Sequence, residues 1–541
     1  MLRDHFGQLS TCERIGIGDK GRMSNQDAPI ASSLPAYISD AKPNPASNRA
    51  PWYKNTAPTY AGIFLWFVFW QDAVLSNSKA GGLAQGVGVA LLGLIIAALI
   101  CHFLFYLVPG TLGLKTGLPL YIVGTSTFGA TGGFILPGFL MGLLQFGWLG
   151  VNAYFSSVLL APTLHIKPEI LMVIWGVLAA FVGLKGIQYV AKVATYLPLI
   201  PVAVLLIMFF KTIGGLGSFD AAKLADAHSA AAGYANPAMS TFDIITGGIL
   251  GFLAVYVVGF FATAGAAGVD FGTNSRDKKD VSMGGLVGIA LAIVLTAGLS
   301  TLIVAGVHGH KEYGPKAVEQ AELAAEKAVA DADKKIATLT QAGKAPSEAQ
   351  ADKLRESDQV TAASAALLRT TSLLSIVLGE GAAKWMMFLL ALAAFPPACF
   401  SSFIAANSFK TTLPKVNPFI SVGIGTAISI ILAVTGLVGD AIGVFVIIGA
   451  SFGPICGAMF VDYLLAGKRW SGPRAGFNPA GWIAWAIGFC VGIWKNLTGY
   501  DMPAAPVAAF VVGAAVYFIC AKIGLMSKVV PLPAAQQPSN Q

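Results

Sequence analysis

The sequence predicts an all-α polytopic membrane protein with twelve transmembrane helices. Of the 541 residues, 55% are hydrophobic and 11% are charged, whereas a globular domain carries about 25% charged residues. The mean hydropathy is +0.69, and apolar runs of spanning length recur from residue 59 to residue 523. Soluble domains of this composition would lack the charged surface that their cores require, so several bilayer-spanning helices are the favoured interpretation.

Twelve apolar runs are long enough for helices of about 20 residues, the length that crosses a bilayer. They cover residues 59–80, 85–108, 133–160, 168–190, 195–213, 242–268, 281–306, 384–407, 417–437, 441–465, 479–495 and 503–523. Lys and Arg concentrate in both tails and in the connections on the same side of the predicted membrane. The short loops on the other side carry only Lys79, Lys167, Lys211, Lys223 and Lys495. The positive-inside rule therefore predicts cytoplasmic N- and C-termini, with a bacterial inner (plasma) membrane as the expected location.

Composition divides the chain into five parts. These are a cytoplasmic tail at 1–58, transmembrane helices 1–7 at 59–306, an extracytoplasmic helical insert at 307–371, transmembrane helices 8–12 at 372–525 and a cytoplasmic tail at 526–541. The insert is Ala-rich and charge-balanced, and we expect it to form two helices. The first covers 318–340, and Ser347 with Gln350 forms a capping box for the second. A solvated helical hairpin is the favoured interpretation, and a docking module for a partner is the alternative.

Trp70, Gln71 and Asp72 lie within the first apolar run. An ionisable side chain at the centre of a membrane span costs about 2.5–3.5 kcal/mol. A helix that keeps such a residue usually uses it, or breaks around it to line a polar cavity. We therefore expect helix 1 to break at this tripeptide, and the tripeptide to face a functional cavity.

The third apolar run contains Gln145, Trp148 and Asn152, which are spaced three and four residues apart. This spacing places two amides and an aromatic ring on one face of a helix. Such a face could stack on a flat ring and hydrogen-bond to its edge. The alternative is that the amides join neighbouring helices and that Trp148 is a packing residue.

The sixth run is rich in glycine, with Phe260 and Phe261 between the glycines and Asp270 at its cytoplasmic end. Clustered glycines usually allow close packing of membrane helices, and they also permit an unwound stretch. Asp270 precedes the basic residues Arg276 and Lys278 in sequence. A gating or structural ion pair is therefore the favoured role for this carboxylate, and substrate binding is the alternative.

The eighth and tenth runs contain prolines where a membrane helix needs its hydrogen bonds. Pro396 and Pro397 remove two backbone donors from the eighth run, and Pro454 follows a glycine in the tenth. We expect both helices to be kinked or broken at these points. Interrupted helices at intervals in a bundle are typical of binding sites in secondary transporters. Asn407 and Pro454 are candidate gating or structural residues.

Several classes of function have no signature in the sequence. No GxxxxGK[ST] or HExxH motif occurs, which argues against ATP-driven transport and against zinc metalloproteases. The six cysteines show no CxxC pairing, so neither a metal site nor another cofactor is expected. The net charge of +8 follows the predicted topology, and it does not indicate nucleic-acid binding.

The chain resembles the nucleobase:cation symporter-1 family, which comprises purine, cytosine, uracil, allantoin and hydantoin permeases. The matching motifs follow the family's order over roughly residues 25–525, outside the insert. They are Asn25-Gln26-Asp27-Ala28-Pro29, Phe69-Trp70-Gln71-Asp72-Ala73, Gly113-Leu114-Lys115-Thr116-Gly117, Thr127-Phe128-Gly129, Gly147-Trp148-Leu149-Gly150-Val151-Asn152, the run 454–463 followed by Lys468-Arg469, and Gly476-Phe477-Asn478.

The resemblance implies a five-plus-five inverted-repeat transporter fold with broken helices 1 and 6 and two extra C-terminal helices. It also implies import of a small heterocycle across the bilayer by alternating access, coupled to a cation. Trp148 would be the stacking platform, Asn152 a hydrogen-bonding residue and Phe261 a second aromatic wall. The other expected substrate-binding residues are Trp70, Gln71, Gln145, Ser401 and Ser402.

Two departures from the family pattern affect the choice of ion and substrate. Ser401 lies where the family commonly has an asparagine, and Pro396-Pro397 lies where it often has hydroxyl ligands for sodium. Asp72 is therefore the candidate ion-coupling residue, with Na⁺ and H⁺ both possible. The alternative functions are a same-fold symporter for another small solute, such as an amino acid, and a transport-silent sensor or scaffold that uses the insert.

Overall fold

The computed structural model describes residues 34–75, 81–185, 196–233, 254–413, 415–500 and 502–532, and all extended regular structure in these ranges is helical. Eight helices are at least 18 residues long and apolar enough to cross a membrane. Three further apolar helices are shorter, namely Tyr256–Ala266, Pro418–Val434 and Pro479–Gly492. The predicted motif at 25–29 and part of the sixth apolar run lie outside the described residues.

The helices before the insert include several that continue directly into one another. In order they are α2 (Ala36–Ser39), η3 (Ala46–Asn48), η4 (Trp52–Lys54), α3 (Thr56–Phe64), α4 (Phe67–Asp72), η5 (Gly81–Leu83), α5 (Val87–Ile100), η6 (Cys101–Tyr106), α6 (Leu107–Thr116), α7 (Leu120–Val123), α8 (Thr125–Phe128), α9 (Ala130–Gly133), η7 (Phe134–Phe139), α10 (Leu140–Leu164), α11 (Pro168–Lys185), α13 (Leu199–Thr212), η8 (Ile213–Ser218), α14 (Ala221–Ala232), η9 (Ala254–Val258), α17 (Gly259–Ala266), α18 (Gly268–Gly272), α19 (Lys278–Gly285), η10 (Leu286–Leu291) and α20 (Ala292–Gly309).

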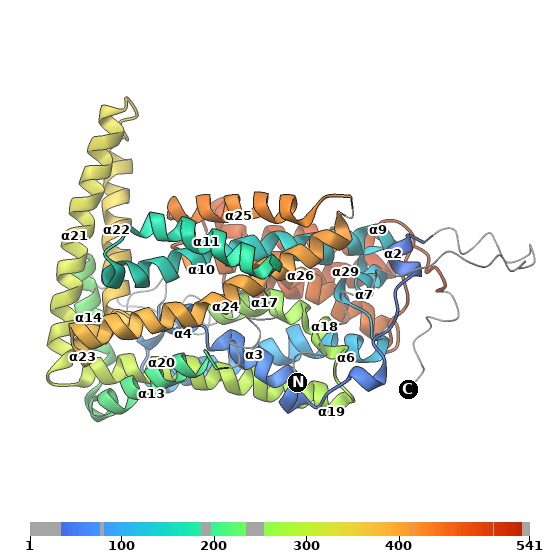
Figure 1. Ribbon diagram of the computed structural model, residues 1–541, viewed down its shortest axis with the longest axis horizontal. Helices are drawn as coiled ribbons and strands as arrows, with labels where there is room; N and C mark the ends of the chain where they lie inside the picture. The colour runs from blue at the N-terminus through green and yellow to red at the C-terminus, as the bar shows by residue number, and fades with distance from the viewer. Residues whose placement is uncertain are drawn as a thin grey trace, which may run out of the picture.

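The second half of the chain begins with the insert. Its helices are α21 (Tyr313–Gln341), α22 (Glu348–Leu368), α23 (Leu374–Leu378), α24 (Glu380–Thr412), α25 (Pro418–Val434), α26 (Ala441–Leu465), α27 (Pro479–Gly492), α28 (Trp494–Thr498) and α29 (Ala505–Lys522). Long helices such as α10 and α24 run along the bundle, with α21 and α22 at one end and α2 and α7 at the other (Figure 1). We call these the insert end and the tail end.

The first apolar run is divided into α3 and α4, and the division lies at Leu65 and Trp66. Trp66 has an extended backbone (φ −64°, ψ 126°), and α4 then continues to Asp72. The sequence prediction of a break at Trp70-Gln71-Asp72 is therefore wrong, because these residues form the last turn of a short helix. A second interruption follows at Ala267, between α17 and α18.

Proline does not break the two helices in which the sequence predicts a break. α24 continues through Pro396 and Pro397, and α26 continues through Pro454. Pro454 fits between two helices that present glycine: a Cβ on Gly488 would lie 2.5 Å from the Pro454 Cβ, and one on Gly513 2.6 Å from its Cα. Close contact with neighbouring helices stabilises the continuous form, so Pro454 is a packing residue in this arrangement.

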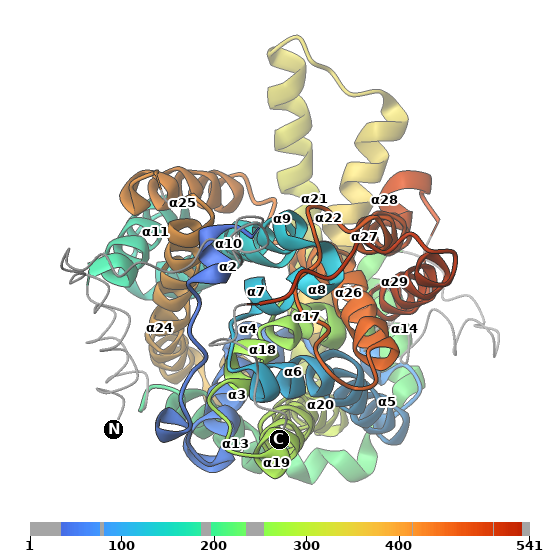
Figure 2. The same cartoon turned by 90° about the vertical axis from the view of Figure 1, so that its right-hand side faces the viewer.

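The insert folds as a helical hairpin that crosses the long axis of the bundle. Figures 1 and 2 both show the tip of α21 and α22 projecting beyond the other helices. The predicted capping box at Ser347 and Gln350 is confirmed. Near the tip, Lys335 of α21 bonds to Asp358 of α22 over 2.9 Å. At its base, the hairpin packs on α14, α20 and α23.

Candidate functional site

Four aromatic rings gather where the chain leaves helix between α3 and α4. Trp148 of α10 lies 5.8 Å from Trp66, 5.1 Å from Phe260 of α17 and 5.3 Å from Phe445 of α26, measured between ring centroids. We call these four residues the Trp148 cluster. Trp148 is the partly exposed member, whereas Phe260 and Phe445 are buried. The cluster therefore offers an aromatic surface to which α10, α17, α26 and the break between α3 and α4 each contribute one ring.

The local backbone explains how Trp66 reaches the cluster. Trp66 lies between two helices and has an extended backbone, so its side chain does not follow the direction that a helix would impose. Its ring packs edge-on against Trp148. Trp66 is 7% exposed, and its indole Nε1–H has no hydrogen-bond partner. A buried indole donor normally finds a partner, so this N–H is available to an acceptor on a bound molecule.

Phe261, the predicted second aromatic wall, lies in a different group of rings. It stacks on Phe64 at 5.8 Å with an interplanar angle of 23°, and it lies 5.7 Å from Tyr60. Its neighbour Phe260 is the ring that contacts Trp148. Adjacent residues of a helix point about 100° apart, so the sequence motif alone does not distinguish these two phenylalanines.

Asn152 joins three helices. Its Oδ1 accepts a hydrogen bond from Trp175 Nε1 of α11 over 2.9 Å, and its Nδ2 donates to the Ala394 carbonyl of α24 over 3.0 Å. Ser156 Oγ lies 3.3 Å from the same Oδ1. In this conformation the amide serves helix contact, which is the alternative role weighed for it from the sequence. Its bond to Ala394 lies in the turn before Pro396.

The other polar residues predicted for the site are engaged within their own helices. Gln145 is 7% exposed, and its Nε2 lies 3.7 Å from Met141 Sδ. Ser402 is fully buried, and its hydroxyl lies 3.4 Å from the Ala398 carbonyl. Ser401 is partly exposed. These hydroxyl and amide groups belong to α10 and α24, the helix pair that Asn152 connects.

Trp70, Gln71 and Asp72 lie at the end of α4, away from the Trp148 cluster. Asp72 is 1% exposed, and its Oδ1 accepts a hydrogen bond from Arg369 Nε over 2.5 Å. Gln71 Oε1 accepts one from Thr371 Oγ1 over 2.5 Å. Trp70 makes no ring contact with the cluster in the described part of the chain. The tripeptide therefore contacts the last residues of the insert.

Asp270 and Asn407 lie outside both groups. Asp270 Oδ1 accepts a hydrogen bond from the Leu120 backbone N–H over 2.9 Å, which holds the start of α7. Among the described residues, Asp270 makes no ion pair, and Arg276 instead pairs with Asp280 over 2.7 Å. The prediction of an ion pair at Asp270 is therefore wrong, because Arg276, in the bend before α19, has a closer partner in Asp280 of α19. Asn407 is an exposed residue of α24.

Sequence reasoning missed three residues that the structure makes central. Trp66 and Phe445 complete the Trp148 cluster, and Arg369 holds Asp72. Trp66 and Phe445 lie in apolar runs, where nothing in the sequence distinguishes a site residue from a packing residue. Arg369 carries a weak signal, because it is the single basic residue between Arg355 and Lys384 and lies at the end of the predicted insert.

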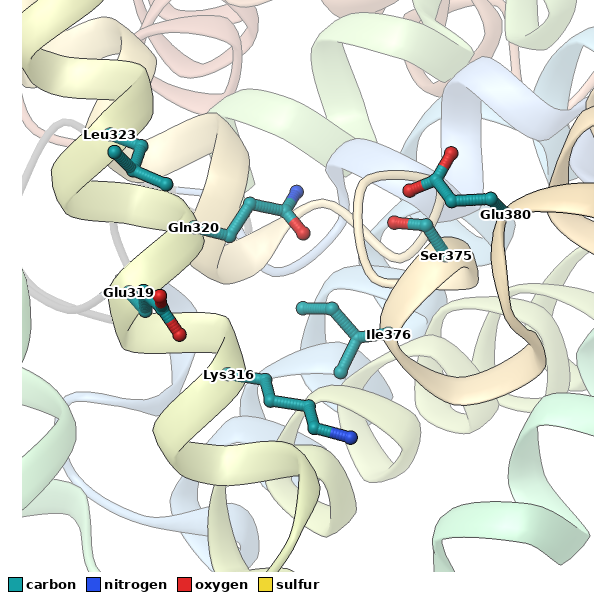
Figure 3. A pocket seen from close by; sticks show the side chains of 7 residues that line it. All are labelled: Lys316, Glu319, Gln320, Leu323, Ser375, Ile376 and Glu380. Atoms are coloured by element: carbon teal, nitrogen blue, oxygen red, sulfur yellow. The ribbon is translucent and has the colours of Figure 1, made fainter.

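A pocket lies between the insert and the helices that follow it in sequence. It is a pocket of about 240 Å³ between α21 and the α23–α24 turn, lined by Lys316, Glu319, Gln320, Leu323, Ser375, Ile376 and Glu380 (Figure 3). Its charged side chains are exposed, and Lys316 is paired with Glu312. Within the described ranges no three His, Cys, Asp or Glu side chains come together as metal ligands.

Comparison with solved structures shows the fold. The chain is similar to Mhp1 in its inward-facing conformation, with 14% identity over 91% of this chain and 98% of that one and a TM-score of 0.52. It is also similar to Mhp1, a nucleobase-cation-symport-1 family transporter, in a closed conformation with bromovinylhydantoin bound, with 14% identity, 91% and 97% coverage and a TM-score of 0.51. A Na⁺-coupled sialic acid symporter matches with 12% identity, 93% and 95% coverage and a TM-score of 0.52.

Comparison of sequences identifies the family. A search of curated proteins gives no match. The sequence profile described as "Permease for cytosine/purines, uracil, thiamine, allantoin" matches residues 43–326, which include α3, α4, α10 and α17. This match covers more than half of the 541 residues. The chain therefore belongs to the family of permeases for cytosine and purines, uracil, thiamine and allantoin.

Proposed function

We propose that this chain is a secondary active transporter that imports a nucleobase or a related small heterocycle by cation-coupled alternating access. Membership of a permease family makes it a membrane transporter and not an enzyme. The proposal adds a substrate class, a driving ion and a direction of transport to that assignment.

The observation that carries the substrate class is the Trp148 cluster. An indole plane that is partly exposed and flanked by Trp66 and Phe260 suits a flat aromatic or amide-containing ring. The unpartnered Trp66 N–H adds one hydrogen-bond donor at the same place. We propose Trp148 as the stacking platform, with Gln145, Ser401 and Ser402 as candidate polar contacts on α10 and α24.

The proposed topology has twelve spans in a five-plus-five inverted repeat followed by two further helices. The interruptions at Leu65–Trp66 and Ala267 would be the breaks in helices 1 and 6. The distribution of Lys and Arg supports cytoplasmic termini and places the insert outside. On this orientation the insert end of the bundle faces the outside, and the tail end faces the cytoplasm.

Asp72 remains the proposed ion-coupling residue, with Na⁺ or H⁺ as the coupling cation. In this conformation the Arg369 guanidinium already balances its charge. The guanidinium bonds to Oδ1, and the other carboxylate oxygen, Oδ2, is buried without a hydrogen-bond partner among the described residues. Measurement of uptake at two sodium concentrations and two pH values distinguishes the two ions: dependence on external sodium supports Na⁺, and dependence on the proton gradient alone supports H⁺.

Binding to the purified full-length chain in nanodiscs tests the site directly. A panel of radiolabelled cytosine, adenine, uracil, thiamine, allantoin and hydantoin identifies a ligand. Trp148→Ala should then weaken its binding about 5- to 150-fold, since stacking of a base on an aromatic ring contributes about 1–3 kcal/mol. The matched control is Trp385→Ala, because Trp385 is 64% exposed on α24. Binding of wild-type strength in Trp148→Ala would refute the assignment.

Two alternative functions predict different results in the same panel. The likeness to a sialic acid symporter supports a same-fold symporter for another small solute, so sialic acid and amino acids belong in the panel. Binding of one of these and of no heterocycle would favour that alternative. A transport-silent sensor would bind a ligand without moving it into proteoliposomes.

A further inference from the structure

The last residues of the insert, Arg369 to Thr371, contact the end of α4 and its neighbour α20 one after another. Arg369 bonds to Asp72, and Thr371 Oγ1 donates to Gln71 Oε1 over 2.5 Å. The hydroxyl of Thr370 lies 2.6 Å from Ser300 Oγ of α20, and Ser300 Oγ donates to the Trp70 carbonyl. These polar groups are almost completely buried, Arg369 excepted, so their geometry is fixed by partners and not by water.

Arg369 also contacts a second helix. Its guanidinium carbon lies 5.4 Å from the ring centroid of Phe155 on α10, within the range of a cation–π contact. One guanidinium therefore joins Asp72 of α4 to Phe155 of α10. We call these three residues the Arg369 latch.

We call the region between α4 and α10 the seam; Arg369 bridges it at one point, and the contact between Trp66 and Trp148 bridges it at another. Asp72 follows Trp66 by six residues, and Phe155 follows Trp148 by seven, so Phe155 and Trp148 share a helix face. At 1.5 Å per residue, Asp72 lies about 10 Å further toward the insert end than Trp66, and Phe155 lies about 10 Å further than Trp148. The latch is thus placed between the cluster and the insert end of the bundle.

The insert determines where Arg369 sits. Shortly before it, the Leu367 carbonyl is bonded to His308 Nε2 of α20 over 2.8 Å, and Ser364 is bonded to His228 Nε2 of α14 over 2.7 Å. Shortly after it, the Ser372 carbonyl accepts a hydrogen bond from Gln320 Nε2 of α21 over 3.1 Å. Anchors on both sides leave the Arg369 backbone little freedom to move independently of the hairpin.

We propose that the insert controls access to the Trp148 cluster from the insert end, by means of the Arg369 latch. Separation of α4 from α10 on that side requires the guanidinium to leave Asp72, Phe155 or both. Movement of the hairpin base carries Arg369 with it and opens the seam. The proposal rests on the proposed function, because only a transported substrate gives such a gate a purpose, but its test requires no substrate.

Leu159 is the reporter position for the test. It follows Phe155 by one turn on the same face of α10 and is 6% exposed, so a thiol there is shielded while the latch is closed. Leu159→Cys is introduced into the full chain in sealed proteoliposomes of known orientation, and the rate of modification by a membrane-impermeant maleimide added at the insert side is measured. The same chain without the reporter gives the background from Cys490, which is exposed.

Arg369→Gln should raise the labelling rate at Leu159→Cys at least about tenfold, because loss of one member of a buried charge pair shifts equilibria by that order or more. Arg355→Gln is the matched control, since Arg355 pairs only with Asp333 and Asp352 on the exposed hairpin. It should leave the rate unchanged. The exchange Asp72→Arg with Arg369→Asp should return the rate toward that of the parent.

An unchanged rate in Arg369→Gln, an equal rise in Arg355→Gln, or no recovery in the charge exchange would each overturn the proposal. If Arg369→Gln does not yield folded protein, Phe155→Leu replaces it, since this change removes the aromatic face and leaves the ion pair. A smaller rise, of at least about twofold, is then expected, and no rise contradicts the latch. Failure of every heterocycle to bind would refute the proposed function without changing the labelling result.

Discussion

Removal of either partner of the Asp72–Arg369 pair should destabilise the protein, but by different amounts. The side chain of Asp72 is 1% exposed, whereas that of Arg369 is 23% exposed. Arg369→Gln leaves a carboxylate buried without a counter-charge, which costs about 3–5 kcal/mol in free energy of unfolding. Asp72→Asn leaves a guanidinium that still reaches water and the Phe155 ring, and the loss of one charge-assisted hydrogen bond costs about 1–2 kcal/mol.

The double variant separates the pair interaction from the cost of the isolated charge. Asp72→Asn combined with Arg369→Gln places two amides at the site and removes both charges, so we expect it to be more stable than Arg369→Gln alone. The resulting coupling energy should be about 2–4 kcal/mol. Arg355→Gln on the exposed hairpin serves as the control and should cost less than about 1 kcal/mol.

Unfolding by titration with sodium dodecyl sulfate in mixed micelles, followed by tryptophan fluorescence, measures these differences. The order of stability should be wild type, then Asp72→Asn, then Arg369→Gln. Equal losses in the two single variants would mean that Asp72 is hydrated in the folded protein. Strict additivity in the double variant would mean that the two side chains do not interact.

Two further predictions concern packing and pH. Gly488→Ala should lower the free energy of unfolding by about 1–3 kcal/mol, because its Cβ would lie 2.5 Å from the Pro454 Cβ. Gly423→Ala is the control, since a Cβ there meets nothing within 4 Å. Equal melting temperatures for the two variants would contradict the prediction. Burial lowers the pKa of His228 to about 4, below the value of about 6.5 expected in the unfolded chain. The unfolded chain therefore gains a proton first as pH falls, and stability at the insert base should fall between about pH 6.5 and pH 4. Hydrogen exchange in α14 and α22 measures this loss, and His228→Gln should reduce it; an unchanged loss in that variant would contradict the prediction.

Local sequence patterns predicted much of the fold. Hydropathy located the apolar helices because a span must be apolar over its whole length, whatever its neighbours are. The capping box at Ser347 and Gln350 was also predictable, since both of its hydrogen bonds join residues three apart. The motif around Trp148 pointed to the permease family before any contact was known.

The orientation of side chains could not be predicted in the same way. Membrane helices are apolar on all sides, so periodicity does not show which face meets another helix. For this reason the sequence indicated Phe261 as the ring beside Trp148, whereas the structure places Phe260 there. The prolines do not interrupt α24 and α26, because contacts with neighbouring helices can compensate for a missing donor, and the local sequence does not show these contacts.

The sequence by itself determined that Trp70-Gln71-Asp72 is exceptional, because an acidic residue in an apolar run carries an energetic cost wherever it is placed. Only the tertiary structure decided what offsets that cost. The partner of Asp72 is Arg369, 297 residues away, and the break in the first apolar run lies at Leu65 and Trp66. A buried charge needs a counter-charge that is close in space, whatever the distance in sequence. The tripeptide therefore contacts the end of the insert, and the aromatic cluster forms around Trp66 and Trp148.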